Sequence, residues 1–180
     1  MTLQDVMLDI ETLSTSSNAC ILTIGAIKFS RGDEVPPLYQ CDTFYHRISK
    51  ESCEEVGLHI DPSTIEWWMK QNEDAKYEVF TKKDRISIKQ ALVEFSEWFG
   101  NSKFIWGHGS VFDVTILNNA YSAHDMTPPW AFWNVRDTRT LYDIGRISVN
   151  SLPQDNTHHA VHDCYRQIVG VKRALTNLGK

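Results

Sequence analysis

An apolar run near the N-terminus, residues 6–13, carries two acids, Asp9 and Glu11, and constrains the fold most. Side chains alternate between the faces of a β-strand, so these acids project from one face while Ile10 turns to the core. Two carboxylates that share one small volume repel each other unless a cation lies between them. Hard oxygen ligands favour Mg²⁺ or Mn²⁺. The run therefore predicts a metal site or, as an alternative, an acid pair at the exposed end of a strand.

The length of 180 residues suits one domain with a substantial core and is short for two, so we expect residues 1–180 to form a single domain. No segment approaches the roughly 18 apolar residues of a membrane span, and no signal peptide is recognisable. We therefore expect a soluble, cytoplasmic protein without a membrane partner. A net charge of −5 argues against broad coating of nucleic acid, but permits an enzyme that holds a few nucleotides through metal ions.

Strand-like patterns and helical patterns follow one another in a recognisable order along the chain. Three strands in close succession, which predict an antiparallel meander, are expected at residues 6–10, 20–29 and 39–48. Two more strands are expected at residues 103–106 and just before residue 137. Apolar periodicity predicts helices after residue 64, at 88–99, after 112, at 139–144 and from 159 or 160 onwards, and residues 73–84 suggest a short helix and a loop. This order predicts an α/β fold with a mixed five-stranded sheet flanked by helices.

Three places that are distant in the sequence can meet at one edge of such a sheet. They are the end of the first strand, the start of the helix after the fourth strand, and the start of the last helix. Asp9 and Glu11 lie at the first place, Asp113 at the second, and His158 with Asp163 at the third. A carboxylate in the first turn of a helix is also explained by the helix macrodipole, without any function.

These residues resemble the motifs of the DEDD superfamily of 3′→5′ exonucleases, which have the ribonuclease H-like fold, and in particular its DEDDh branch of DnaQ-like and RNase T-like enzymes. Asp9 and Glu11 match the D-x-E of the first motif. Asp113 matches the acid at a helix start in the second motif. His158 and Asp163 match the H-x-x-x-x-D of the third. The resemblance covers essentially the whole chain in the order of its elements.

The resemblance implies hydrolysis from a free 3′-OH end of single-stranded DNA or RNA, or of 3′ overhangs, with release of 5′-mononucleotides. Two divalent cations, Mg²⁺ or Mn²⁺, would activate water and stabilise the leaving oxygen. Asp9 is expected to bridge the two ions. Glu11 and Asp163 would bind the ion that activates water, and Asp113 would complete the second site. His158 is expected to act as the general base.

The resemblance also suggests contacts with the substrate. Thr12 and Leu13 are similar to positions that hold the terminal 3′-OH and wedge against the last base. The adjacent Trp67 and Trp68 lie about 100° apart on a helix, so one can enter the core while the other stays near the surface. A base could stack on the accessible ring, with plain packing as the alternative. The segment around His108 is similar to small phage and bacterial exonucleases, and a homodimer is compatible with the family.

Other classes of protein explain part of the pattern. His162-Asp163 is the H-D pair of an HD-type metal phosphohydrolase, but that class requires helices where the first fifty residues predict strands. A non-catalytic nucleic-acid-binding module of the same fold would not need four intact acids. A zinc site at His158, His159, His162 and Cys164 would crowd four ligands into about one and a half helical turns, which gives poor tetrahedral geometry. His159 and His162 also depart from the H-R-A-L-x-D of many relatives.

Overall fold

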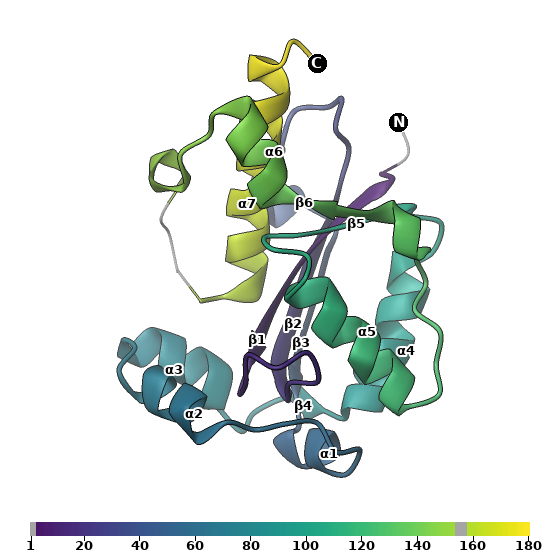
Figure 1. The fold of residues 1–180 in the computed structure, drawn as a ribbon, viewed down its shortest axis with the longest axis vertical. Helices are drawn as coiled ribbons and strands as arrows, with labels where there is room; N and C mark the ends of the chain where they lie inside the picture. The colour runs from purple at the N-terminus through teal and green to yellow at the C-terminus, as the bar shows by residue number, and fades with distance from the viewer. Residues whose placement is uncertain (1–2, 154–157) are drawn as a thin grey trace.

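The computed structural model describes residues 3–153 and 158–180, and within them six strands form one mixed sheet (Figure 1). The strands are β1 (Asp5–Thr12), β2 (Ile21–Phe29), β3 (Thr43–Ile48), β4 (Arg85–Ile86), β5 (Phe104–Gly107) and β6 (Val135–Asp137), in the spatial order β4-β3-β2-β1-β5-β6. β1, β2 and β3 form the antiparallel meander that the sequence predicts. β5 pairs parallel with β1, and β6 pairs parallel with β5. The expected mixed α/β sheet is therefore confirmed.

The number of strands differs from the expected five because β4, a strand of two residues, pairs parallel with β3. Its first residue, Arg85, is anchored by its side chain: Nη1 donates to the carbonyl oxygen of Ile48 at 2.6 Å, and Nε donates to that of Thr81 at 2.7 Å. Such contacts between a side chain and distant backbone leave no periodic pattern in the sequence, so this strand could not be predicted. The third strand is also shorter than expected, because residues 38–40 form a 3₁₀ turn after Pro37.

Seven α-helices in the described residues connect and cover the strands. They are α1 (Lys50–Glu54), α2 (Pro62–Met69), α3 (Glu73–Phe80), α4 (Ile88–Phe99), α5 (Asp113–Ala123), α6 (Thr138–Gly145) and α7 (Ala160–Asn177). Two helix starts are capped by aspartate side chains, since Asp61 accepts from the backbone N–H of Ser63 and Asp137 accepts from that of Thr140. Such caps contribute about 1 kcal/mol each. Of the helices described, none has the combination of length and apolar composition that a membrane crossing requires.

The two faces of the sheet are covered by different helices, with α4 and α5 on one face and α6 and α7 on the other (Figure 1). Alternation along β1 follows this division. Leu8 and Ile10 belong to the core cluster that includes residues of α4 and α5, whereas Met7 packs with residues of α6 and α7. Asp9 and Glu11 continue the Met7 face towards the end of the strand, so the acids lie on the side of the sheet that α7 covers.

Helix α7 approaches the sheet closely at Gly25 of β2. A Cβ atom at Gly25 would lie 2.5 Å from the Cβ of Ala160 and 2.7 Å from its carbonyl carbon. Gly25 is also the register partner of Asp9 in the β1–β2 ladder. The missing side chain therefore lets the start of α7 lie directly over the strand pair that carries the acid.

Gly25→Ala is expected to destabilise the protein by about 1–3 kcal/mol, because the backbone of α7 must shift to relieve the overpacking. Urea denaturation of the purified variant measures this change. Gly32→Ala is the matched control, since a Cβ there would meet only the Ser30 Oγ at 4.0 Å, and it should stay within about 0.5 kcal/mol of wild type. Equal stability of the two variants would contradict the close approach of α7.

Candidate active site

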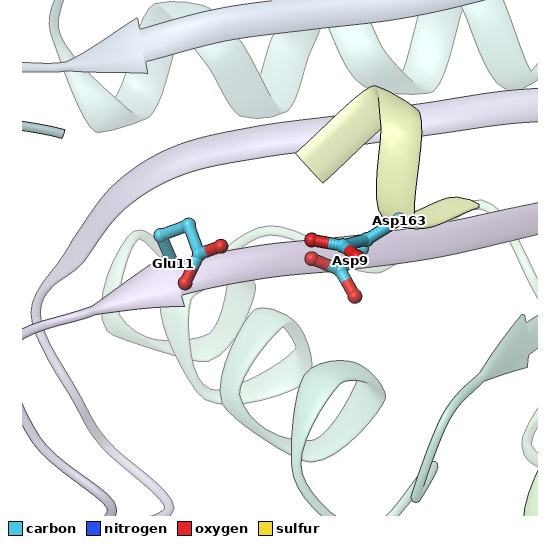
Figure 2. Close-up of side chains that lie close together, drawn as sticks. All are labelled: Asp9, Glu11 and Asp163. Atoms are coloured by element: carbon cyan, nitrogen blue, oxygen red, sulfur yellow. The ribbon is translucent and has the colours of Figure 1, made fainter. Parts of the chain in front are cut away.

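Three carboxylates from opposite ends of the chain lie together at the end of β1. One oxygen atom from each of Asp9, Glu11 and Asp163 lies within 4.8 Å of the others. Figure 2 shows Asp9 and Asp163 facing each other between β1 and α7, with Glu11 further along the strand. Clustered carboxylate oxygens are the ligands that hard divalent cations prefer. The structure thus brings together three of the four acids that the sequence analysis selects.

Asp113, the fourth acid, lies beside this group but outside it. It is the first residue of α5 and is only 4% exposed. Its Oδ1 accepts a hydrogen bond from the backbone N–H of Ile10 at 3.3 Å. Its Oδ2 would lie 3.2 Å from a Cβ at Gly107, so the absence of a side chain there makes room for the acid. Asp113 is therefore held against β1 at Ile10, the residue that separates Asp9 and Glu11 in the sequence.

Burial is the largest cause that raises the pKa of each of the four acids. Burial raises the pKa of Asp9 well above its usual value, and the charges of Asp113, Glu11 and Asp163 raise it further. Burial, with the charges of Asp163 and Asp113, raises the pKa of Glu11 to about 8. Burial also raises the pKa of Asp113 to about 7 and that of Asp163 above its ordinary value. Full ionisation of the cluster is unfavourable without a counter-charge, so the donor set fits divalent cations.

A cavity of about 400 Å³ opens next to the acids and is lined in part by aromatic residues. Trp68 is 1% exposed, and its Nε1 donates to the backbone carbonyl oxygen of Thr12 at 2.9 Å. Trp67 is 46% exposed, so one tryptophan is fixed in the wall while the other offers its ring to solvent. The complete lining is Ile10, Glu11, Thr12, Thr15, Ser63, Thr64, Trp67, Trp68 and Phe112.

The chain matches a known protein family over nearly its whole length. The family described as 3′-5′ exoribonuclease Rv2179c-like domain matches residues 4–175. The chain belongs to this family. The protein is thus a 3′→5′ exonuclease of the DEDD type, as the sequence motifs predict. The two other classes, an HD-type phosphohydrolase and a non-catalytic module, are wrong.

The exonuclease is also similar to individual proteins. The exodeoxyribonuclease of Enterobacteria phage T4 is 24% identical over 206 aligned positions, which include 95% of this chain and 88% of the relative. The solved structure of cell-death related nuclease 4 (CRN-4) has a TM-score of 0.52 and 9% identity, and the match covers 97% of this chain and 64% of that one. The structure of S. pombe Pop2p in its Mg²⁺ and Mn²⁺ bound form has a TM-score of 0.53 and 14% identity, with coverages of 93% and 81%. These structural similarities confirm the ribonuclease H-like fold.

His158 of the exonuclease lies between the acids and the aromatic wall. Its backbone N–H donates to Asp163 Oδ2 at 2.9 Å, while Arg166 Nη2 pairs with the other oxygen at 2.7 Å. Its ring lies edge-on to Trp67 and Trp68, with centroids 5.4 and 5.7 Å apart. Its φ of +66° is uncommon for a residue with a side chain, and such conformations concentrate at functional sites.

The other expected substrate contacts have different positions. Thr12 lines the cavity, but Leu13 is 2% exposed and packs in the core. His108 lies outside the cavity lining, where its Nδ1 lies 2.7 Å from the hydroxyl oxygen of Thr138. Burial and the nearby Arg139 lower the pKa of His108. Of these three residues, Thr12 lines the cavity, whereas Leu13 and His108 do not.

The candidate zinc ligands do not form a metal site in the part of the chain that the structure describes. Cys164 is buried, and its thiol faces the backbone carbonyl oxygens of Met7 and Gly25. The ring of His159 stacks on Tyr45 at a centroid distance of 4.9 Å. These side chains are used for packing on different sides of the helix start.

Several lining residues are missing from the sequence-based set. Ser63 and Thr64, in the first turn of α2, and Phe112, just before α5, line the cavity. Phe112 could have been found from its place next to Asp113. Ser63 and Thr64 carry no comparable signal, because short polar residues after an N-cap are common at any helix start.

Proposed function

We propose that residues 1–180 act as one domain that removes 5′-mononucleotides from the free 3′-OH end of single-stranded DNA or RNA, or of 3′ overhangs, with two divalent cations, Mg²⁺ or Mn²⁺. The observation that supports this most directly is the convergence of Asp9, Glu11 and Asp163 within 4.8 Å beside an aromatic cavity. A single-stranded end can enter such a cavity, whereas the interior of a duplex cannot present its bases to the tryptophans.

Asp9, Glu11, Asp113 and Asp163 would hold the cations. When bound, divalent ions supply the positive charge that favours ionisation of the attacking water and stabilises the departing 3′-oxygen. The Mg²⁺ and Mn²⁺ bound form of Pop2p supports this choice of ions. The chain itself contributes the fixed geometry: the N–H of Ile10 orients Asp113, and the N–H of His158 orients Asp163.

The imidazole of His158 would accept the proton of the attacking water. The backbone N–H of His158 donates to Asp163, so the residue is held next to the acidic cluster. Rotation about its side-chain bonds would bring the ring to the cluster. The packing of the ring against Trp67 and Trp68 places it at the border between the cluster and the cavity. A base at this border is next to both the acids and the end of the substrate.

The terminal nucleotide would occupy the aromatic cavity. The exposed Trp67 offers a stacking surface for the base, and Trp68 keeps the wall in place through its hydrogen bond to Thr12. The hydroxyl groups of Thr15, Ser63 and Thr64 line the same cavity and provide polar contacts for the sugar. A cavity that takes the terminal nucleotide would favour cleavage from a free end.

Trp67→Ala is expected to raise the KM for a single-stranded oligonucleotide by about 5–150-fold, since stacking of a base on an aromatic ring contributes about 1–3 kcal/mol. Turnover at saturating substrate should change much less. Trp133→Ala is a suitable control, because Trp133 is 67% exposed and does not line the cavity. Equal KM values for both variants would show that the base does not stack on Trp67.

The proposed function is tested with 5′-labelled single strands of DNA and RNA in the presence of Mg²⁺ or Mn²⁺. A linear strand should shorten stepwise from its 3′ end, and a 3′-phosphate should block the reaction. A circular strand of the same sequence should resist. Cleavage of the circle as fast as of the linear strand would show an endonuclease, and paired DNA and RNA substrates reveal which sugar is preferred.

A further inference from the structure

Helix α7 directs a second polar side chain at the carboxylate cluster. Gln167 follows Asp163 by four residues, so the two side chains lie on the same face of the helix, one turn apart. The Nε2 of Gln167 donates a hydrogen bond to Asp9 Oδ1 at 2.8 Å. Gln167 is only 4% exposed. A buried amide therefore contacts the acid at the centre of the cluster.

Packing does not explain a glutamine at this position. The neighbouring buried residues of α7 are apolar and belong to one core cluster: Cys164, Ile168, Val171 and Ala174. Glutamine is mostly an exposed residue type. The Oε1 of Gln167 is buried and has no hydrogen-bond partner within residues 3–153 and 158–180. An unsatisfied buried acceptor is unfavourable, so the favourable contact of this amide is the one made by its other end, the Nε2 that donates to Asp9.

The contact constrains Asp9 without neutralising it. A hydrogen bond to Oδ1 restrains rotation of the carboxylate about its Cβ–Cγ bond, because rotation would break the contact with Nε2. The amide donor is neutral, whereas Arg166, which pairs with Asp163 at 2.7 Å, brings a full positive charge to the cluster. A neutral donor orients the acid and leaves its negative charge for a cation. Outer hydrogen-bond partners of metal ligands commonly have this role.

We propose that Gln167 is a positioning residue, which orients the carboxylate of Asp9 for a divalent cation. The inference rests on the proposed function of the acidic cluster, and it adds a residue that lies outside the three motifs. It predicts that removal of the amide weakens binding of the cation before any substrate is present, and that the folded protein does not need the amide for its stability.

Gln167→Met tests this, because methionine has a similar length and no polar atom that can replace the amide donor. Titration calorimetry with Mn²⁺, without nucleic acid, should show an affinity about 10–100-fold lower than wild type. The thermal midpoint of the metal-free variant should equal or exceed that of wild type, since the unsatisfied Oε1 is removed. Gln90→Met is the matched control: Gln90 Nε2 donates to Glu94 Oε1 at the same distance of 2.8 Å, on an exposed face of α4.

Gln167→Leu serves as a second apolar variant. Loss of Mn²⁺ affinity with a preserved thermal midpoint in either variant supports the positioning role. Mn²⁺ affinity within twofold of wild type overturns the positioning role. A loss of Mn²⁺ affinity that is accompanied in both variants by a lowered thermal midpoint also overturns it, since that result shows a packing role. Asp9→Asn in the same titration separates the two proposals. Normal Mn²⁺ binding by Asp9→Asn would contradict the metal site itself, whereas weak binding by Asp9→Asn and normal binding by both Gln167 variants would contradict only the role of Gln167.

Discussion

Asp9→Asn is expected to lower turnover by about 10³-fold or more, because Asp9 is the acid that the three others surround. Asp113, Glu11 and Asp163 each raise its pKa through their charges. Metal ions supply several kcal/mol of transition-state stabilisation, and each 1.36 kcal/mol corresponds to a factor of ten in rate. Asparagine has nearly the same shape and still offers an oxygen to the Gln167 amide, so the fold should remain intact. The assay is single-turnover cleavage of a labelled single strand.

The same substitution should stabilise the metal-free protein at neutral pH. A carboxyl group whose pKa is raised by folding binds more protons in the folded state than in the unfolded state, so stability falls as the pH rises. For this cluster the loss extends from about pH 4, the ordinary range of carboxyl groups, to the raised pKa of about 8 at Glu11. Asp9→Asn removes one of the charges. Its thermal midpoint in EDTA should therefore decrease less than that of wild type between pH 5 and pH 8.

Asp74→Asn is the control for both measurements, since Asp74 is an exposed acid in the first turn of α3. It should keep wild-type turnover and leave the pH dependence of the cluster unchanged. Full activity of Asp9→Asn, or of the wild-type enzyme in EDTA, would rule out catalysis by metal ions at this cluster. A steeper fall in stability for Asp9→Asn than for wild type would contradict the repulsion between the acids.

The spacing of apolar residues predicted those parts of the site that depend on one strand or one helix alone. The two-residue period of β1 places Asp9 and Glu11 on one face. The apolar spacing of the last helix predicts a start at residue 159 or 160, and the helix begins at Ala160, just before Asp163. Contacts between elements could not be predicted in this way. The approach of α7 depends on Gly25 and Ala160, which are distant in sequence and have no polar group to indicate their contact.

Leu13 shows how a local irregularity changes an expectation. A regular strand would place Leu13 on the same face as Asp9 and Glu11. The register of β1 against β2 shifts between Glu11 and Thr12, as in a β-bulge, which interrupts the alternation. Leu13 then joins the core cluster of Leu8 and Ile10 on the opposite side. An irregularity of one residue at the strand end therefore decides which side chains face the cavity, and no residue type in this stretch indicates it.

His158→Ala is expected to lower turnover by about 10²–10⁴-fold, the usual effect of losing a general base, with little change in Mn²⁺ affinity. The substitution removes the ring but keeps the backbone N–H that donates to Asp163, so the acid remains oriented. The positive φ of residue 158 makes alanine unfavourable there, whereas asparagine tolerates this conformation and cannot act as the base. His158→Asn should therefore reproduce the loss without the backbone cost.

His162→Ala is the decisive comparison, because His162 precedes Asp163 by one residue and so projects about 100° away from it on the helix. Its ring lies against that of His159, with centroids 4.8 Å apart, and so packs with a neighbouring side chain. We expect near-normal turnover for His162→Ala. A large loss of turnover in His162→Ala, together with nearly normal turnover in His158→Asn, would show that the third motif is in a different register. Turnover of all three variants is measured across pH with saturating metal. The variant that lacks the general base should show both a lower turnover and a changed pH profile, and this separates the two assignments.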